Sequence, residues 1–262
     1  MSKAKLMSSS KTNKINTIYN IFNRKKILLP VIHIITIEQT LINARILHQN
    51  NVKGCWIINH SCSDKVFADA YNQIKATYPN LWVGINYLGR EFAPIIFCSE
   101  FNIKPDGFWF DNVGVSDHDA TKGHKIRKLM VQTGLSDVLV FGSICFKYQR
   151  QPKSVETTTK TALDICDVIT TSGKGTGIDH DVSDVNKFRT MKAICTENTY
   201  LAVASGISES NISNILEHVD IFMVNTSIAK DEIFIPEKVA NLVKIINNYE
   251  YSLESNTKNI DS

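Results

Sequence analysis

The stretch YLAVASGISESNISNILEHVDIFMVNTS, residues 200–227, contains the pattern that decides the fold. Residues 200–204 and 221–225 are short apolar runs, which are typical of strands buried on both faces of a parallel sheet. Between them, Ile212, Ile215 and Leu216 have helical spacing, and Ser208 is a good N-cap for a helix there. The stretch therefore predicts a strand, a helical crossover and a second, parallel strand.

Runs of the same kind recur along the rest of the chain, and the segments between them have helical periodicity. The strand candidates are residues 27–34, 54–59, 81–87, 107–112, 138–146, 168–171, 200–204 and 221–225. Residues 27–250 thus form eight units of about 28 residues. Strands that alternate with helices eight times favour an α/β protein with a single (β/α)8 TIM barrel. The alternative is an open doubly wound sheet.

The ends of the chain differ in composition from this repeating region. Ile15, Ile18, Tyr19 and Phe22 predict an extra N-terminal helix over residues 13–23. We expect residues 1–12 to be a disordered basic leader, residues 13–250 to form the barrel and residues 251–262 to be a flexible polar tail. Because residues 1–26 are rich in Lys and Ser and contain no acid, organelle import is a second interpretation of the leader.

Composition excludes several classes of protein. The 262 residues are 43% hydrophobic and 21% charged, which excludes a disordered chain, a collagen-like repeat and a disulfide scaffold. No apolar run approaches the roughly 20 residues of a membrane-spanning helix. The net charge is +3, but seven basic residues precede Glu38; the remaining 22 basic and 26 acidic residues argue against a nucleic-acid partner. Six cysteines without a CxxC pair favour a reducing, cytoplasmic location.

Three loops carry the signature of a phosphate site. The segment TTSGKGTG, residues 170–177, alternates glycines with hydroxyl residues after a strand, so successive backbone N–H groups could approach an anion. In TIM barrels a phosphate is often held by the loops after strands seven and eight. The candidate phosphate-binding residues are Ser172, Gly173, Thr176, Gly177, Gly206, Ile207, Thr226 and Ser227. The alternative is turn and helix-cap chemistry alone.

Other polar residues follow the predicted strands and are the candidates for catalysis, because active sites of barrels lie at the carboxyl ends of the strands. They are His33, Asp64, Asn86, Asp111, Asn112 and Lys147. Lys147 is expected to stabilise charge or act as a general acid, and His33, Asp64 and Asp111 to transfer protons. A lysine after an apolar strand is otherwise a side chain that reaches out to solvent.

Cys62 and two Asp-His-Asp segments are weaker candidates. Cys62 has no His and carboxylate assigned to it as a nucleophile. Residues 117–119 and 179–181 could offer metal ligands, but their spacing favours helix caps, and no metal site is predicted. The one cofactor considered is Mg²⁺ that would arrive with a phosphorylated ligand.

Several segments together resemble the BtpA/SgcQ-like family of TIM barrels, named for a photosystem assembly factor and a sugar-metabolism protein. The resemblance covers residues 15–249 and includes IFNRKKILLPVIHI, VGINYLGREFAPIIF and GFWFDNVGVSDHDATKG. The most specific segments are DVITTSGKGTG, VASGISESNI and DIFMVNTSI, which are similar to the family's SGxxTG, GSGxxxEN and GTS motifs. The resemblance maps Asn86 and Asn112 onto strand-end asparagines of the family.

The departures from the family pattern concern acid and base positions. The family's Glu-Asn pair is Asn59-His60 here, its strand-five Asp is Ser143, and its Lys-His is Lys147-Tyr148. The phosphate-side motifs are retained, so two functions stay open. The first is an enzyme of isomerase, lyase or glycosyl-transfer type acting on a phosphosugar or nucleotide. The second is a non-catalytic assembly or regulatory barrel. In either case we expect a homo-oligomer such as a dimer.

Overall fold

A parallel sheet closed on itself forms the centre of the molecule. The computed structural model describes residues 18–89, 92–196 and 199–260. The sheet contains β1 (Ile27–Leu28), β2 (Val31–His33), β3 (Gly54–Ile58), β4 (Trp82–Asn86), β5 (Gly107–Phe110), β6 (Leu139–Ser143), β7 (Val168–Ser172), β8 (Tyr200–Ala204) and β9 (Ile221–Met223), paired in the order β1-β9-β8-β7-β6-β5-β4-β3-β2. The predicted strand runs are therefore confirmed.

The barrel closes at Pro30. The segment before it, β1, pairs with β9, and the segment after it, β2, pairs with β3. Proline has no N–H to donate, but its carbonyl accepts a hydrogen bond from Trp56 N at 2.9 Å, while Val31 N donates to Val224 O at 2.8 Å. One strand thus joins both edges of the sheet, and the fold is the predicted TIM barrel rather than an open sheet.

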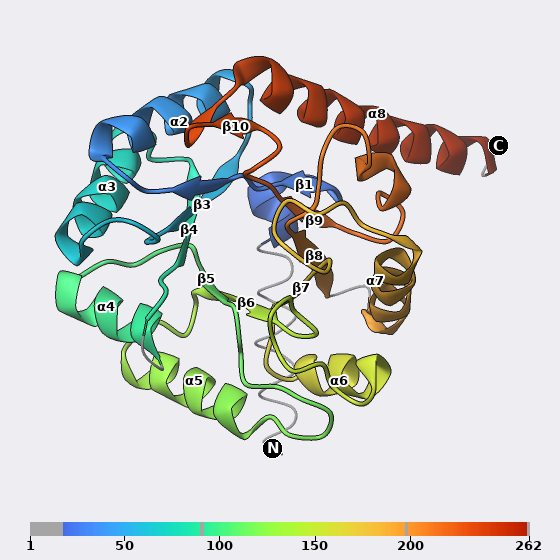
Figure 1. The fold of residues 1–262 in the computed structure, drawn as a ribbon, viewed down its shortest axis with the longest axis horizontal. Helices are drawn as coiled ribbons and strands as arrows, with labels where there is room; N and C mark the ends of the chain where they lie inside the picture. Colours follow the sequence, from blue (N-terminus) through green and yellow to red (C-terminus); the bar gives the residue numbers. More distant parts are fainter. Residues whose placement is uncertain (1–17, 90–91, 197–198, 261–262) are drawn as a thin grey trace.

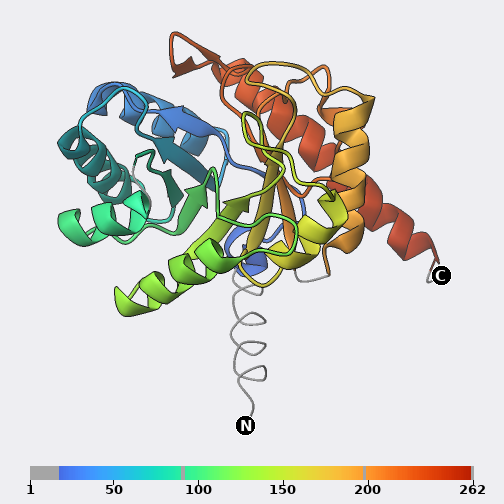
Figure 2. The same cartoon turned by 60° about the horizontal axis from the view of Figure 1, so that its bottom comes forward.

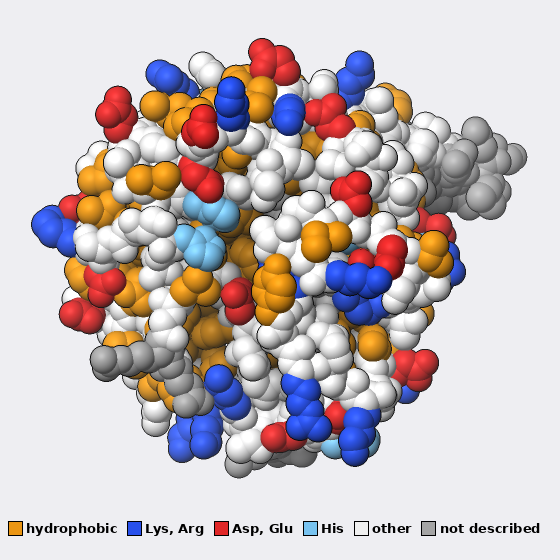
Figure 3. Space-filling view, viewed as in Figure 1, with side chains coloured by type: hydrophobic (Ala, Val, Ile, Leu, Met, Phe, Trp, Pro, Cys, Tyr) orange, Lys and Arg blue, Asp and Glu red, His pale blue; other side chains and the backbone are white. Residues whose placement is uncertain are grey.

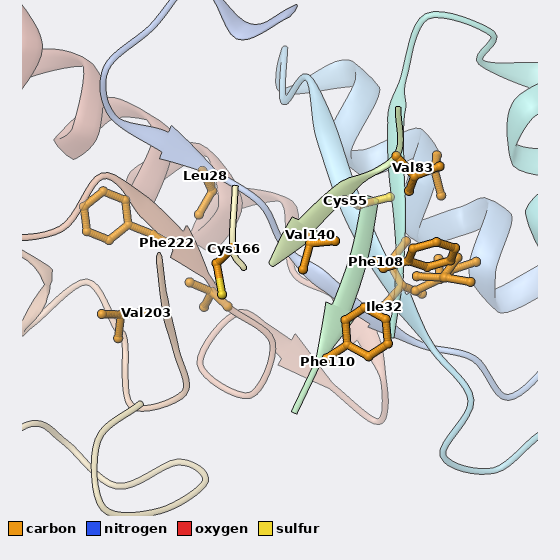
Figure 4. Close-up of a cluster of buried hydrophobic side chains, with 14 of the residues drawn as sticks. Leu28, Ile32, Cys55, Val83, Phe108, Phe110, Val140, Cys166, Val203 and Phe222 are labelled. Atoms are coloured by element: carbon orange, nitrogen blue, oxygen red, sulfur yellow. The ribbon is translucent and has the colours of Figure 1, made fainter. Parts of the chain in front are cut away.

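Helices surround this sheet (Figure 1). They are α2 (Ile37–Gln49), α3 (Asp64–Thr77), α4 (Ala93–Phe101), α5 (Thr121–Gln132), α6 (Val155–Ala162), α7 (Val182–Ile194) and α8 (Pro236–Ile260). Side chains alternate between the two faces of each strand, so Cys55 packs toward the helices with Val83 and Phe108 (Figure 4), whereas Trp56 lies in the barrel interior. None of the described helices is long and apolar enough to cross a membrane.

Aromatic side chains fill the barrel interior. The ring centroids of Trp56 and Trp82 are 5.0 Å apart, and those of Trp56 and Phe141 are 4.7 Å apart, in edge-to-face geometry. Gly84 leaves the space for these rings, because a Cβ atom there would lie 2.3 Å from Cζ3 of Trp56. The interior is thus a packed core below the mouth rather than a pore.

The N-terminal end of the barrel is covered by a helical turn over residues 18–22. Ile18 and Phe22 are buried in the interior cluster, and the ring centroid of Phe22 is 5.8 Å from that of Trp82. An extra helix is predicted for residues 13–23, and the helical turn over residues 18–22 agrees with that prediction. The leader, residues 1–12, and residues 13–17 lie outside the described residues.

Two predictions about helices are wrong. Between β8 and β9 the chain forms a 3₁₀ turn, η1 (Ile212–Asn214), rather than a helix capped by Ser208. The chain here makes 3₁₀-type hydrogen bonds, from Asn214 N to Asn211 O and from Ile215 N to Ile212 O, both at 3.0 Å. At the other end of the chain, α8 continues past Glu250 to Ile260, since no Gly or Pro interrupts it. Most of the predicted tail is therefore helical.

A two-stranded hairpin, β10 (Ala229–Lys230) and β11 (Ile233–Phe234), interrupts the chain between β9 and α8. Its turn consists of Asp231 and Glu232, both with left-handed backbone angles. Figure 2 shows the hairpin at one end of the barrel and residues 18–22 toward the other end. The hairpin therefore lies at the end of the barrel where the strands have their carboxyl ends.

Candidate functional site

A cavity of about 300 Å³ opens at the carboxyl ends of the strands. It is lined by Val31, His33, Ile58, His60, Trp109, Asp111, Phe146, Lys147, Tyr148, Thr176, Gly177, Asp179, Ala204, Ser205, Gly206, Ile207, Ser208, Met223, Val224, Asn225, Thr226 and Ser227. In the space-filling view, histidine side chains lie beside a hollow near the centre of this face (Figure 3). The volume is at the lower end of the range for small-molecule sites.

Lys147 reaches from the end of β6 toward the loops that follow β7 and β8. Its Nζ donates to Thr176 Oγ1 at 2.7 Å and to Ser205 Oγ. The ring centroids of Phe146 and Tyr148 lie 5.7 Å and 5.8 Å from Nζ. Burial lowers the pKa of Lys147, although Tyr148 and Asp111 oppose that shift. The ammonium group is thus placed at the cavity wall with hydroxyl groups as its hydrogen-bond partners.

The loop after β7 is held from behind. Ser172 is fully buried; its Oγ accepts from Lys147 N at 2.8 Å and donates to Gly173 O. Lys187 on α7 donates to Ser172 O, and burial lowers the pKa of this lysine. Ser172 and Gly173 therefore support the loop and do not line the cavity, whereas Thr176 and Gly177 do.

The loop after β8 contains two successive residues with left-handed backbone angles, Ser205 (φ 75°) and Gly206 (φ 74°). The Ser205 carbonyl lies 2.8 Å from His180 Nε2. A Cβ atom at residue 206 would lie 2.3 Å from Ile178 O, so Gly206 is required for the packing of the neighbouring loop. Ile207 is buried next to it. The backbone of this loop is thus fixed against the loop after β7.

The loop after β9 completes this side of the cavity with Thr226 and Ser227. In the part of the chain that the structure describes, Ser227 Oγ is buried and has no hydrogen-bond partner. Buried hydroxyl groups without a partner are uncommon, and this one belongs to a residue that lines the cavity.

Asp111 and His60 form another part of the wall. Burial raises the pKa of Asp111, and the hydrogen bond from Asn86 Nδ2 to Asp111 Oδ1, 2.8 Å long, opposes that shift. Burial lowers the pKa of His60, and the neighbouring His33 lowers it further. A carboxyl group with a raised pKa and a neutral imidazole are suited to proton transfer near neutral pH.

His33 contacts a residue that is not among the candidates predicted from the sequence. Its Nδ1 lies 3.2 Å from Oε2 of Glu232 at the hairpin turn. Tyr148, Ser205 and Asn225 are further lining residues absent from the predicted set. All three lie at or just after the ends of predicted strands, which could have indicated them, but nothing local marks Glu232.

Two of the predicted catalytic residues, Asp64 and Asn112, and the weaker candidate Cys62 do not line the cavity. Asp64 accepts from Tyr87 Oη at 2.5 Å beside the start of α3. The Asn112 side chain accepts from Gly114 N at 2.8 Å. Burial and Asp64 raise the pKa of the Cys62 thiol, which disfavours the reactive thiolate.

The carboxylates of the two Asp-His-Asp segments accept hydrogen bonds from neighbouring groups, and one of them, Asp181, is the N-cap of α7. Asp117 accepts from Ser154 N at 3.0 Å, Asp119 accepts from Thr121 N at 2.9 Å, and Asp181 caps α7 through Asp184 N at 3.0 Å. Asp179 accepts from Asn211 Nδ2 at 2.8 Å. Over residues 18–89, 92–196 and 199–260, no group of three His, Cys, Asp or Glu side chains is placed to share a metal ion.

Comparisons of the whole chain identify the class of protein. The fold is similar to (S)-3-O-geranylgeranylglyceryl phosphate synthase from Thermoplasma acidophilum in complex with sn-glycerol-1-phosphate, with a TM-score of 0.64 and 14% identity over 88% of this chain and 97% of that one. It is also similar to tryptophan synthase subunit alpha from Legionella pneumophila, with a TM-score of 0.64 and 14% identity over 91% and 98%. For N-(5'-phosphoribosyl)anthranilate isomerase from Pyrococcus furiosus, the TM-score is 0.58 and the identity 14% over 85% and 99%.

The chain is therefore a TIM-barrel protein, in agreement with the predicted fold class. No family model matches the sequence, and a search of curated proteins finds no match. At 14% identity these structural likenesses establish the fold, and function has to be argued from the site itself.

Proposed function

We propose that the barrel binds a phosphorylated small molecule, a phosphosugar or a nucleotide, and converts it in a reaction of isomerase, lyase or glycosyl-transfer type. The observation that carries the proposal is Lys147, whose Nζ contacts hydroxyl groups of two different loops at the wall of the cavity. A cation beside hydroxyl and backbone donors is the arrangement that binds a phosphate group.

In this proposal the phosphate lies between Lys147 and the loops with Thr176, Gly177, Gly206, Ile207, Thr226 and Ser227. Ser172 and Gly173 support the loop and do not line the cavity. The unpaired hydroxyl of Ser227 supports this placement. Phosphate binding far from the reacting bond supplies energy that positions the substrate. Asp111, oriented by Asn86, and His33 are the groups proposed to transfer protons, and Lys147 also stabilises developing charge.

The motifs quoted above support the finer proposal that the chain is BtpA-like. A non-catalytic assembly or regulatory role is the second candidate, and a specific observation favours it. Asn59 replaces an acid of the family pattern, and its side-chain Nδ2 donates a hydrogen bond to Leu88 O at 3.0 Å. Ser143 replaces another acid and accepts from Trp109 Nε1 at 2.9 Å. Both positions are structural in this chain.

We also propose that the protein works in the cytoplasm as a homo-oligomer, such as a dimer, and that residues 13–250 are its functional unit. The six free cysteines support a reducing compartment. Import into an organelle through residues 1–26 is the alternative.

Thermal denaturation with a panel of pentose phosphates and nucleoside monophosphates, each paired with its dephosphorylated form, tests the proposal. The expected result is that phosphorylated members raise the Tm and their partners do not, and that at least one stabilising compound is converted. Stabilisation without conversion by any member would favour the non-catalytic candidate. A Tm that no phosphorylated compound changes would overturn phosphate binding.

A further inference from the structure

The hairpin turn brings a carboxylate to the mouth of the barrel. Glu232 lies 199 positions from His33 in the chain, yet His33 Nδ1 is 3.3 Å from Glu232 Oε1 and 3.2 Å from Oε2. Asn225 Nδ2 donates to Oε2 at 3.3 Å and to Val31 O at 2.8 Å. The carboxylate therefore accepts from an imidazole and an amide that both line the cavity.

The backbone of this turn is unfavourable and is held in place by buried side chains. Asp231 and Glu232 have φ angles of 50° and 60°, which residues with a Cβ rarely adopt. Gln39 and Asn43, both buried on α2, donate to Glu232 O at 2.7 Å and 2.8 Å. Such a conformation persists only where its surroundings determine it, and it is found preferentially at functional sites.

The same helix positions the histidine. Gln39 Nε2 also donates to His33 O at 3.2 Å, so one buried amide contacts both members of the pair. On its other side, His33 packs edge-to-face against His60, with ring centroids 4.9 Å apart. The ring of His33 is therefore restrained from two directions.

We propose that Glu232 is a positioning residue that makes His33 the general base of the site. An ionised carboxylate only accepts hydrogen bonds, so Nδ1 of a neutral His33 carries the proton in this contact and Nε2 has the free lone pair. The inference rests on the proposed function, because it requires a substrate in the cavity.

The proton transfer balances within these groups. Nε2 takes a proton from a hydroxyl or carbon of the substrate, whose bonding electrons stay on that atom, and His33 becomes an imidazolium. Glu232 stabilises this cation through Nδ1–H, and the proton later returns from Nε2 to the product. Lys147 lines the same cavity, so we expect a substrate that carries an anionic group besides its reacting centre. The inference thus favours proton-transfer isomerisation or elimination among the reaction types.

The test reads the tautomer of His33 by long-range ¹H–¹⁵N correlation at about pH 9, above the range in which histidines usually titrate. Protein labelled with ¹⁵N-histidine is used, and His33→Asn assigns the signal. Glu232→Met removes the carboxylate and leaves no oxygen to accept from Nδ1–H, and Asp231→Asn is the matched control with the same loss of charge one residue away in the turn. Inorganic phosphate is added in a separate thermal denaturation series.

The expected result is a proton on Nδ1 in the wild type and in Asp231→Asn, and a shift of the tautomer population toward Nε2–H in Glu232→Met. A proton on Nε2 in the wild type overturns the inference without need of any variant, so it stays testable if Glu232→Met does not fold. An unchanged tautomer in a folded Glu232→Met also overturns it. The phosphate series reports on the anion site alone, so a failure of phosphate binding is distinguished from a failure of the histidine pair.

Discussion

Replacing Lys147 by methionine tests the anion site most directly. Methionine keeps an apolar side chain of similar length and removes the ammonium group, which donates to Thr176 Oγ1 at 2.7 Å and to Ser205 Oγ. A hydrogen bond to a charged group contributes about 1.5–3 kcal/mol. At about 1.4 kcal/mol for each tenfold change, the Kd for phosphate should rise roughly 10- to 150-fold.

The stability of this variant should change little. Each of the two lost hydrogen bonds has a charged donor and contributes up to about 1.5–3 kcal/mol, but Thr176 is exposed and Ser205 is half-buried, so water can replace the ammonium group. Removal of the burial penalty that lowers the pKa of Lys147 offsets part of that cost. We expect a net change within about 1 kcal/mol, which in a chain of this size shifts the Tm by roughly 2–4 °C. The variant thus separates binding from folding.

The assay is isothermal calorimetry with inorganic phosphate, supported by thermal denaturation. Lys174→Met is the matched control, because this lysine is in the same loop as Thr176 but is exposed and paired with Asp181. It should leave the phosphate Kd within about twofold of the wild type, as expected for a surface pair. Wild-type affinity in Lys147→Met, or an equal loss in Lys174→Met, would refute the assignment of Lys147.

Three further variants test the packing and the electrostatics. Gly84→Ala places a methyl group 2.3 Å from a ring carbon of Trp56 and should cost about 1–3 kcal/mol in guanidinium denaturation; an unchanged midpoint would show that the ring moves freely. Asp111→Asn should raise the Tm at pH 7, because burial raises the pKa of this carboxyl and its ionisation therefore destabilises the fold as pH rises through that raised pKa. The gain should disappear as the pH falls toward the ordinary value of 3.8, and a gain that does not depend on pH would contradict this cause. Asn43→Ala leaves the Glu232 carbonyl without its 2.8 Å donor and should make the hairpin more sensitive to limited proteolysis, whereas equal cleavage rates would show that Gln39 alone holds the turn.

The strands and the loops after them could be predicted from the sequence because their signals are local. The apolar and β-branched side chains of a run such as residues 168–172 predict a strand that is buried on both faces of a sheet. The repetition of such runs limited the fold to a barrel or an open sheet. Thr176 and Ser227 were found for the same reason, since the ends of parallel strands meet at one edge of the sheet.

Tertiary structure decided what depends on contacts distant in sequence. The crossover after β8 is a 3₁₀ turn, and Asn211 in it hydrogen-bonds to Asp179, 32 positions away, as well as to its own loop. Closure of the barrel depends on the pairing of β1 with β9. The contact of Glu232 with His33 needs that closure and the buried amides of α2, and neither is visible in the residues around the turn. A side chain's surroundings, and with them its hydrogen-bond partners and its pKa, are determined by the assembled barrel, whereas the tendency of a segment to form a buried strand is determined by its own residues.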